Sequence, residues 1–292
     1  MVVDGTEPQV SIVIPVYNEE EAIGDDLDTI IATMEGSGYT YEVIVVDDGS
    51  TDRTADIARA KGVKVIQHPI NRGTGAARRT GILQAQGEVI VMTDGDGTYP
   101  NQDIPRLLEY LPAFDQVVGA RTSEQGSFRF LRAPAKWFIR KLACYLTGMD
   151  IPDLNSGLRA FKREAMLKFL YLIPDGFSCV STMTLAFLCN GYTIKYVPID
   201  YYTRVGRSKF HPINDTYNYV LTVIRMVMYF NPLKVFLPAS LILFLLGAAK
   251  TIYDNFVNLR IRESDVIIVV ISIVIGMMGL LADLIVVQHK PR

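Results

Sequence analysis

The chain has 292 residues, of which 49% are hydrophobic, and its formal net charge is −2. This length allows one large domain or two small ones with a substantial core, and the nearly balanced charge gives no indication of a nucleic-acid partner. Cys144, Cys179 and Cys189 form no CxxC pair, so we expect reduced core cysteines and neither a zinc site nor a disulfide. Residues 1–8 are polar and acidic, and no secretory signal peptide is predicted there.

Apolar runs and helical patterns alternate from residue 10 to residue 120. The predicted strands are 10–15, 43–46, 63–66, 89–92 and 116–119, and the predicted helices between them are 19–34, 52–60, 75–86 and 103–111. This alternation predicts an α/β fold, a Rossmann-like and mostly parallel sheet with helices on both faces. Ligands of such sheets bind beyond the carboxyl ends of the strands. We therefore expect the chemistry at residues 15–19, 47–50 and 94–98.

Two carboxylates one residue apart follow the fourth predicted strand, in the stretch MTDGDGTYP at 92–100. Asp94 and Asp96 repel each other unless a cation lies between them, and the glycines at 95 and 97 indicate a tight backbone. In proteins, Mg²⁺ is usually bound by one or two carboxylates together with substrate phosphates. We therefore predict that this pair binds Mg²⁺ or Mn²⁺ on a phosphorylated ligand. The alternative is a solvated turn.

Two further motifs lie at matching strand ends, PVYNE at 15–19 and VDDGSTD at 46–52. Together with the acidic pair they resemble, in the same order, the PxYNE, VDDGSxD and DxD motifs of the family 2 glycosyltransferases of GT-A fold. The resemblance implies a nucleotide-sugar donor, a divalent cofactor and a set of nucleotide-binding residues. These are Pro15, Tyr17, Glu19, Asp48, Gly73, Asp94 and Gly95.

Asp48 matches the acid that hydrogen-bonds the base, and Gly73 belongs to a stretch, NRGTG at 71–75, that resembles the N-x-G-x-G turn of the family. A dinucleotide-binding fold could be proposed from Gly73 and Gly75. However, these glycines follow the third predicted strand instead of the first, and the third glycine of that fingerprint is missing.

The second half resembles the polyprenyl-phosphate sugar synthases of this family, of the dolichyl-phosphate mannose and undecaprenyl-phosphate glucose type. The matching stretches are VGAR at 118–121, DLNSGLRAF at 153–161 and RVGRSK at 204–209. No QxxRW occurs, which argues against the processive cellulose- and hyaluronan-type synthases. The DADLQH of the family is DGDGTYP here, so Thr98 replaces a glutamine that assists the metal in relatives. Further metal ligands and the identity of the sugar therefore stay open.

The resemblance implies inverting transfer of a hexose, from UDP-glucose or GDP-mannose, to the phosphate of a polyprenyl phosphate. Such an acceptor is already an anion and needs no strong base, whereas fixed cations would support its approach to an anionic donor. The candidate catalytic residues are Asp96, Arg121, Asp153, Arg204, Ser208 and Lys209. The candidates for the acceptor phosphate are Arg121, Arg132, Arg204 and Lys209. The alternative is a solvated surface position for each cation and a turn for Asp153.

Two other functions stay in view. One is a membrane-anchored glycosyltransferase that acts on another lipid or on a glycan. The other is a non-catalytic nucleotide-binding or scaffolding protein, against which the intact acidic pair argues. The sequence leaves the sugar, the base and the lipid length open. The oligomeric state is also open, and a homo-oligomer is one possibility.

From about residue 230 the sequence is typical of a membrane protein. The stretches 233–253 and 266–287 are long enough to cross a bilayer, which takes ~20 apolar residues, and the second carries one charge, Asp283. Two buried core helices are the alternative, but neither stretch has a polar face. Basic residues before the first stretch and after the second place both termini in the cytoplasm.

We therefore predict a cytosolic glycosyltransferase domain at 1–210, an interfacial amphipathic helix at 211–231 and two spans in the cell membrane within 232–292. A core helix is the alternative for 211–231. The stretch 128–146 mixes basic and aromatic residues and is predicted to lie on anionic lipid. Its alternative is a helix packed on its own domain.

Overall fold

The structure, a computed structural model, describes residues 7–122, 140–141, 143–145, 147–176, 178–204, 228–229, 231–260 and 262–289. The chain divides into two compact units, residues 1–222 and residues 223–292. The first unit contains a β-sheet with helices, and the second contains two long helices. Two helices were predicted at 128–146 and 211–231. Most residues of each lie outside the described ranges, so both helices stay predictions.

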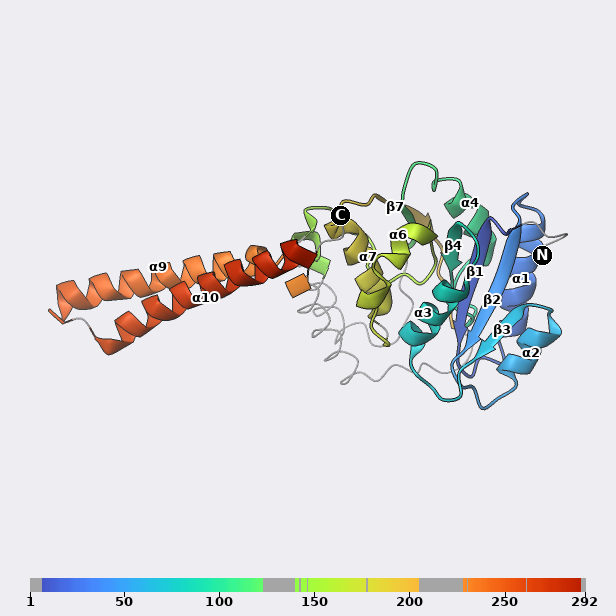
Figure 1. Ribbon diagram of the computed structural model, residues 1–292, viewed down its shortest axis with the longest axis horizontal. Coiled ribbons are helices and arrows are strands. Elements are labelled where there is room, and N and C mark those ends of the chain that lie inside the picture. The colour runs from blue at the N-terminus through green and yellow to red at the C-terminus, as the bar shows by residue number, and fades with distance from the viewer. Residues whose placement is uncertain are drawn as a thin grey trace. The chain divides into compact units, whose positions relative to one another are not determined.

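The sheet of the first unit has seven strands in the order β3-β2-β1-β4-β6-β5-β7. Figure 1 shows β3, β2, β1 and β4 side by side. The strands are β1 (Val10–Val16), β2 (Tyr41–Asp47), β3 (Lys64–Gln67), β4 (Val89–Met92), β5 (Gln116–Arg121), β6 (Arg159–Lys162) and β7 (Ile194–Ile199). The first five confirm the predicted strands. Valine and isoleucine dominate β1 and β2, whose residues are almost all buried, as expected for strands covered on both faces.

One strand departs from the predicted pattern. β6 lies between β4 and β5 and runs antiparallel to both, with Arg159 opposite Met92. Neither β6 nor β7 was predicted. Because β6 runs in the opposite direction, its first residue lies beside the last residue of β4. The segment before β6 is therefore brought to the edge where the parallel strands end.

Helices cover both faces of the sheet (Figure 1). One face carries α1 (Ile23–Glu35), α2 (Thr54–Ala60) and α4 (Ile104–Leu108), and the other carries α3 (Thr74–Gln84), α6 (Arg163–Leu167) and α7 (Cys179–Cys189). The described part of the unit also contains two short 3₁₀ turns, η1 (Asn101–Asp103) and η2 (Leu170–Leu172). Helix α1 buries Ile23, Leu27, Ile30 and Met34 against the sheet, which is the i, i+3, i+4 spacing of an amphipathic helix.

The second unit is a hairpin of α9 (Leu233–Val257) and α10 (Glu263–His289). Both helices are long and apolar enough to cross a membrane. They pack along their length, and the Ser240 hydroxyl donates to the Ser272 carbonyl oxygen across the pair at 2.8 Å. The unit therefore has the two membrane spans that the sequence predicts.

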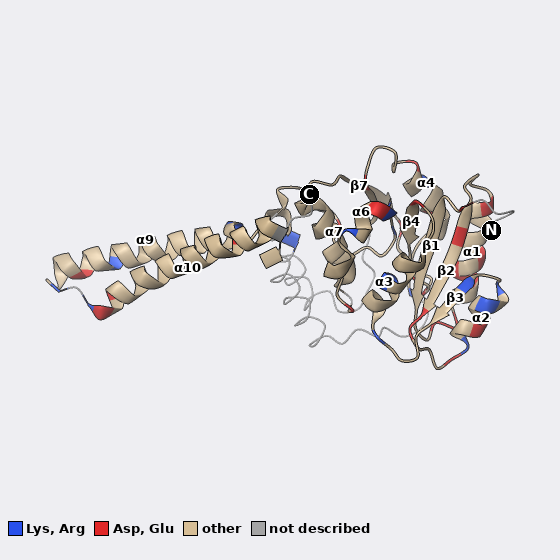
Figure 2. Cartoon of the chain, in the orientation of Figure 1, with Lys and Arg blue, Asp and Glu red and all other residues tan. Residues whose placement is uncertain are grey.

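Charged residues of the hairpin gather where the two helices are joined (Figure 2). Lys250 donates to Asp265 and, at 3.1 Å, to Asp254, while Arg262 lies 3.8 Å from Asp254. Both carboxylates are buried. We call Lys250, Asp254, Arg262 and Asp265 the loop-end cluster.

Candidate active site

The strand ends bring the predicted motifs together. In the sheet, β1 lies between β2 and β4, all three in parallel, so that Pro15 pairs with Val46 and Val13 pairs with Met92. The PVYNE, VDDGSTD and DGDGTYP motifs therefore leave the sheet side by side. The strands β5 and β7 end at the same edge, and β6 begins there. This topology adds the segments around Arg121, Asp153 and Arg204.

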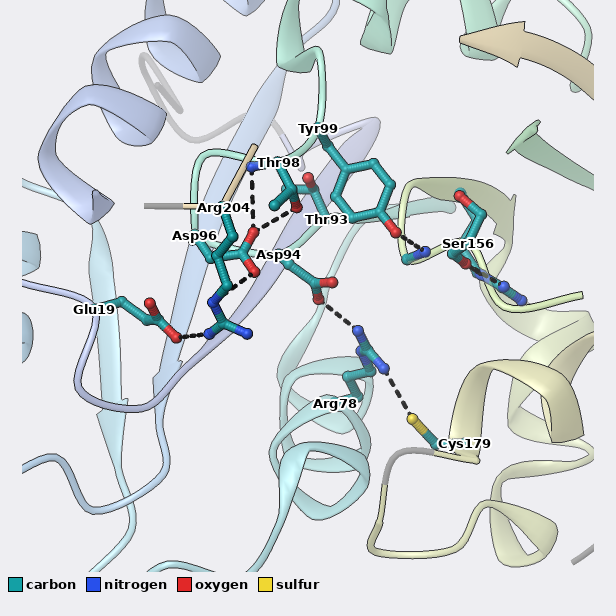
Figure 3. A network of polar contacts seen from close by, with 12 residues as sticks. Glu19, Arg78, Thr93, Asp94, Asp96, Thr98, Tyr99, Ser156, Cys179 and Arg204 are labelled. Carbon is teal, nitrogen blue, oxygen red and sulfur yellow. Dashed lines mark hydrogen bonds and ion pairs between the residues drawn. The ribbon is translucent and has the colours of Figure 1, made fainter. Parts of the chain in front are cut away.

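Asp94 is held by an arginine that was not predicted as a site residue from the sequence (Figure 3). Nη2 of Arg78, a residue of α3, donates to Asp94 Oδ1 at 2.5 Å, and Nη1 lies 2.9 Å from the Cys179 sulfur. The Arg78 side chain is 5% exposed and that of Asp94 is 30% exposed. A buried arginine thus fixes one oxygen of Asp94, while the Asp94 side chain as a whole stays partly exposed.

Asp96 lies deeper and has different partners. Its Oδ1 accepts hydrogen bonds from the Thr98 amide at 3.2 Å and from the Thr98 hydroxyl at 2.5 Å. Its Oδ2 lies 3.4 Å from Arg204 Nε, while Nη2 of the same arginine donates to Glu19 (Figure 3). Burial, and then the charge of Asp94, raises the pKa of Asp96. Arg204, predicted at the acceptor phosphate, therefore lies beside the acidic pair.

A third carboxylate lies next to the acidic turn. Asp26 of α1 is 7% exposed and accepts hydrogen bonds from the Gly97 amide and the Asn101 side chain, both at 2.9 Å. Burial, with the charges of Asp96 and Asp94, raises the pKa of Asp26 to about 7. Asp26 was not among the site residues predicted from the sequence. The signal was present, because this acid falls on the face of α1 that is otherwise apolar.

Arg121 and Asp153 form a buried ion pair. Nε and Nη2 of Arg121 donate to the two carboxylate oxygens at 2.7 and 2.9 Å, and the guanidinium lies 5.1 Å from the ring centre of Tyr201. Burial alone would raise the pKa of Asp153, but the hydrogen bonds and charge of Arg121 hold it below its usual value. The side chains are 12% and 10% exposed, so the surface alternative for Arg121 is wrong. Two predicted residues are thus joined to each other.

The SGLR segment lies close to the acidic pair. The Gly157 amide donates to the Tyr99 hydroxyl at 2.7 Å, and the ring of Tyr99 packs edge-on against Tyr201. Arg159 is fully buried and donates to the carbonyl oxygens of Ser156 and Val180. Burial, and then the charge of Arg78, lowers the pKa of Arg159 to about 10. The Arg159 side chain thus anchors the segment through hydrogen bonds to backbone carbonyl oxygens.

Asp48 and Gly73, predicted at the nucleotide, contact each other. The buried Asp48 carboxylate accepts from the Gly73 amide at 2.7 Å and the Arg72 amide at 3.0 Å, and lies 2.7 Å from His68 Nδ1. Gly73 has a φ of +96°, and a side chain there would overlap the carbonyl oxygen of Asp175. Asp48 therefore holds the glycine turn, and its contact with a base stays a prediction.

The remaining predicted residues divide into two groups. Pro15 is buried in β1, Tyr17 is half-buried just beyond it, and Gly95 separates the two acids. The others lie outside the described residues, and their roles stay predictions. They are Arg132, Ser208 and Lys209.

The acidic pair fits a divalent ion. Oδ2 of Asp94 accepts no hydrogen bond from the described residues, and Oδ2 of Asp96 faces Arg204 Nε at 3.4 Å. Hard carboxylate oxygens are the ligands that Mg²⁺ and Mn²⁺ prefer. Within the described ranges, no three His, Cys, Asp or Glu side chains are grouped to hold a metal. The other ligands would therefore be substrate oxygens and water.

The chain matches two families along its length. Residues 11–170 match "Glycosyl transferase family 2", and residues 231–287 match "GtrB C-terminal hairpin". The protein named glycosyltransferase AglJ of Haloferax volcanii is 31% identical, with 98% of this chain and 97% of that protein covered. The dolichyl-phosphate hexose transferase of the same organism is 36% identical over 71% of this chain and 89% of its own.

A bacterial relative and a solved structure extend the comparison. The undecaprenyl-phosphate 4-deoxy-4-formamido-L-arabinose transferase of Pseudomonas fluorescens is 36% identical over 60% of this chain and 56% of its own. Glucosyl-3-phosphoglycerate synthase from Mycobacterium tuberculosis, crystallised with Mn²⁺, UDP and glucosyl-3-phosphoglycerate, has a TM-score of 0.59 at 21% identity. That match covers 75% of this chain and 80% of the synthase. The GT-A-like fold is therefore shared.

Proposed function

The chain belongs to the family 2 glycosyltransferases, and we propose that it transfers a hexose from a nucleotide sugar to the phosphate of a polyprenyl phosphate. The observation that carries the proposal is the grouping of a carboxylate pair, the partly exposed Asp94 and the buried Asp96, with Arg204 at one sheet edge. Relatives named for dolichyl- and undecaprenyl-phosphate transfer support the choice of acceptor. The hairpin would hold the enzyme at the membrane where such an acceptor lies.

The acidic pair would hold Mg²⁺ or Mn²⁺, which when bound neutralises the charge of a diphosphate leaving group. Arg78 of α3 holds Asp94 in place, and the Thr98 amide and hydroxyl orient Asp96. These contacts are made before any substrate arrives, so the carboxylates need not reorganise during the reaction. Tyr17, Glu19 and the Asp48–Gly73 turn would line the nucleotide.

The reaction needs positioning more than proton transfer. An oxygen of the acceptor phosphate forms a bond to the anomeric carbon while the bond from that carbon to the β-phosphate oxygen breaks. The nucleoside diphosphate leaves, and the anomeric configuration inverts. Because the nucleophile is an anion, cations must support its approach to an anionic donor.

We assign that support to Arg204, Arg121 and the predicted residues Arg132, Ser208 and Lys209. Arg204 lies between Glu19 and Asp96, so its guanidinium can stabilise the negative charge that phosphate groups bring near the acidic pair. Asp153 occupies Nε and Nη2 of Arg121, which leaves Nη1 to meet an anion. Asp153 would therefore orient this arginine.

We place the glycosyltransferase domain and both chain termini on the cytosolic face. Basic residues flank the hairpin on the sides away from its loop, and such residues favour the cytoplasmic side. This placement would give the active site access to soluble nucleotide sugars and to the phosphate of a membrane-held lipid.

The test is to incubate membranes that contain the full chain with Mn²⁺, polyprenyl phosphate and labelled UDP-glucose, GDP-mannose or UDP-N-acetylglucosamine in turn. We expect one donor to give a labelled lipid that mild acid releases as sugar, and we expect the Asp96→Asn variant to give none. Label on a different lipid or on a glycan would overturn the assignment of the acceptor. It would favour a membrane-anchored glycosyltransferase of another acceptor class.

A further inference from the structure

The turn that carries the acidic pair is fastened from behind by a buried polar network. Asp26 Oδ2 accepts from the Gly97 amide, and Asp26 Oδ1 accepts from the Asn101 side chain, both at 2.9 Å. The Asn101 carbonyl oxygen in turn accepts from the Thr93 hydroxyl at 2.7 Å. Asp26, Thr93 and Asn101 are 7%, 0% and 1% exposed. The network is therefore shielded from water.

The three fastened points bracket the turn. Thr93 directly follows β4, Asn101 opens η1, and Gly97 lies between them. The carboxylate of Asp26 is the common acceptor for two of these points, and it comes from a helix far away in the sequence. The path of the chain past Asp94 and Asp96 thus depends on a side chain of α1.

Of the two acids, Asp96 depends more directly on this network. Gly97 follows it directly and has a φ of +73°, in the left-handed region that favours glycine. The Asp96 carboxylate is tied to the amide and hydroxyl of Thr98, on the other side of Gly97. A change at Gly97 would therefore move both the backbone of Asp96 and the group that orients its carboxylate.

Burying a carboxylate at this position is costly. Asp26 lies among the apolar residues of α1, one turn from Ile23 and from Ile30, and it lies close to two other acids. A buried charge near like charges is unfavourable unless hydrogen bonds compensate it. An apolar residue would fit the stripe without this cost, but it would leave the Gly97 amide and the Asn101 side chain without their acceptor.

We propose that Asp26 is a positioning residue for metal binding: it holds Gly97 and Asn101, and through them it sets Asp96. The inference rests on the proposed metal role of Asp94 and Asp96, and it adds a residue that touches neither metal nor substrate. Residues that orient metal ligands from behind commonly contribute 10- to 100-fold in metal affinity, an order-of-magnitude range.

The test measures Mn²⁺ binding to the purified full chain in detergent, by the EPR signal of free Mn²⁺, with UDP or GDP present in separate titrations. Asp26→Ala removes both acceptors, and we expect the Kd for Mn²⁺ to rise about 10-fold or more. Asp25→Ala is the matched control, because Asp25 is the neighbouring acid on the exposed face of α1. Its Kd should equal that of the wild type.

Two further variants separate hydrogen bonding from charge. Asp26→Asn keeps one oxygen for the Gly97 amide, so its Kd should lie between those of wild type and Asp26→Ala. The double variant Asp26→Asn with Asn101→Asp can form all three hydrogen bonds again, with the amide of the new asparagine donating to the new carboxylate. We expect it to recover most of the affinity.

The wild type and Asp96→Asn form the first arm, because loss of Mn²⁺ binding in Asp96→Asn establishes the metal site independently of Asp26. Given that loss, wild-type affinity in Asp26→Ala would overturn the role of Asp26. Equal affinities for Asp26→Asn and Asp26→Ala would show that only the charge of Asp26 matters, which would overturn its positioning role. If Asp26→Ala does not fold, the comparison of Asp26→Asn with the double variant decides. An unchanged Kd in Asp26→Asn, or no recovery in the double variant, would then overturn the proposal.

Discussion

Arg121 and Asp153 face each other with two hydrogen bonds, at 2.7 and 2.9 Å, and both side chains are about nine-tenths buried. The two residues come from the end of β5 and from the loop before β6. They meet because β6 runs against its neighbours and begins at the edge where β5 ends. The pair therefore ties the antiparallel insertion to the parallel part of the sheet.

Asp153→Asn should destabilise the protein and lower its activity. The substitution leaves a buried guanidinium without its counter-charge, and breaking a buried pair in this way commonly costs about 3 kcal/mol. Thermal unfolding of the full chain in detergent, followed by circular dichroism, measures the effect. Asp56→Asn is the matched control, because the Arg59–Asp56 pair is exposed and such pairs contribute little. Equal melting temperatures for the two variants would contradict the prediction.

Arg204→Ala should lower the rate of transfer to the lipid more strongly than the rate of hydrolysis of the donor. We expect kcat for polyprenyl-phosphate glycosylation to fall about 100-fold, the loss typical for one preorganised group that stabilises developing charge. Mn²⁺-dependent hydrolysis of the nucleotide sugar should fall less. Arg53→Ala serves as the control, because Arg53 is 80% exposed and pairs with Glu20. Unaltered lipid transfer in Arg204→Ala would favour a different acceptor.

Gly73→Ala should be far more damaging than Gly38→Ala. Both glycines have a positive φ, +96° and +79°, so each substitution carries the left-handed penalty of ~1 kcal/mol. At Gly38 an added Cβ meets nothing within 4 Å, whereas at Gly73 it overlaps the Asp175 carbonyl oxygen. Gly73→Ala should therefore lower the melting temperature further and weaken nucleotide binding, measured by calorimetry with UDP and GDP. Equal effects of the two substitutions would count against the packed turn.

The stability of the metal-free protein should depend on pH through Asp26. Burial and the neighbouring acids raise the pKa of this carboxyl from 3.8 to about 7. Between these pH values the folded protein keeps a proton that the unfolded chain releases, so the free energy of unfolding falls as the pH rises through this window. Asp26→Asn cannot titrate. In EDTA, its melting temperature should therefore improve relative to wild type between pH 5 and pH 8, approximately the range in which the carboxyl ionises. A constant difference would contradict the raised pKa.

The parallel half of the sheet was predictable because its strands are continuous apolar runs. Val10–Val16 and Val89–Met92 have nearly the predicted bounds, and their order with helices fixes a parallel arrangement. β6 was missed because its four residues, RAFK, carry two charges and follow an irregular segment. Its antiparallel direction depends on pairing with both β4 and β5, which no local pattern encodes.

The acidic pair and several of its neighbours were predictable from motifs at strand ends. Arg78 and Asp26 were missed, because a charge on a helix is usually solvated and both lie on helices with other charges nearby. For Asp26, its place on the apolar face of α1 was nevertheless a signal of burial. In the fold each points inward, and Arg78 binds a residue 16 positions away. Tertiary contacts, which a single sequence does not display, decide which helical charge is buried.

The loop-end cluster has a consequence for how the protein enters a bilayer. In a two-span topology the segment between α9 and α10 must pass through hydrocarbon to reach the far side, and each lone charge resists that passage by a few kcal/mol. Lys250 and Arg262 offset Asp254 and Asp265 in number, and they already contact one another in the folded hairpin. The charges of the turn can thus cross the bilayer as a neutral group. The pairing lowers the free-energy cost of insertion, although the turn itself stays polar.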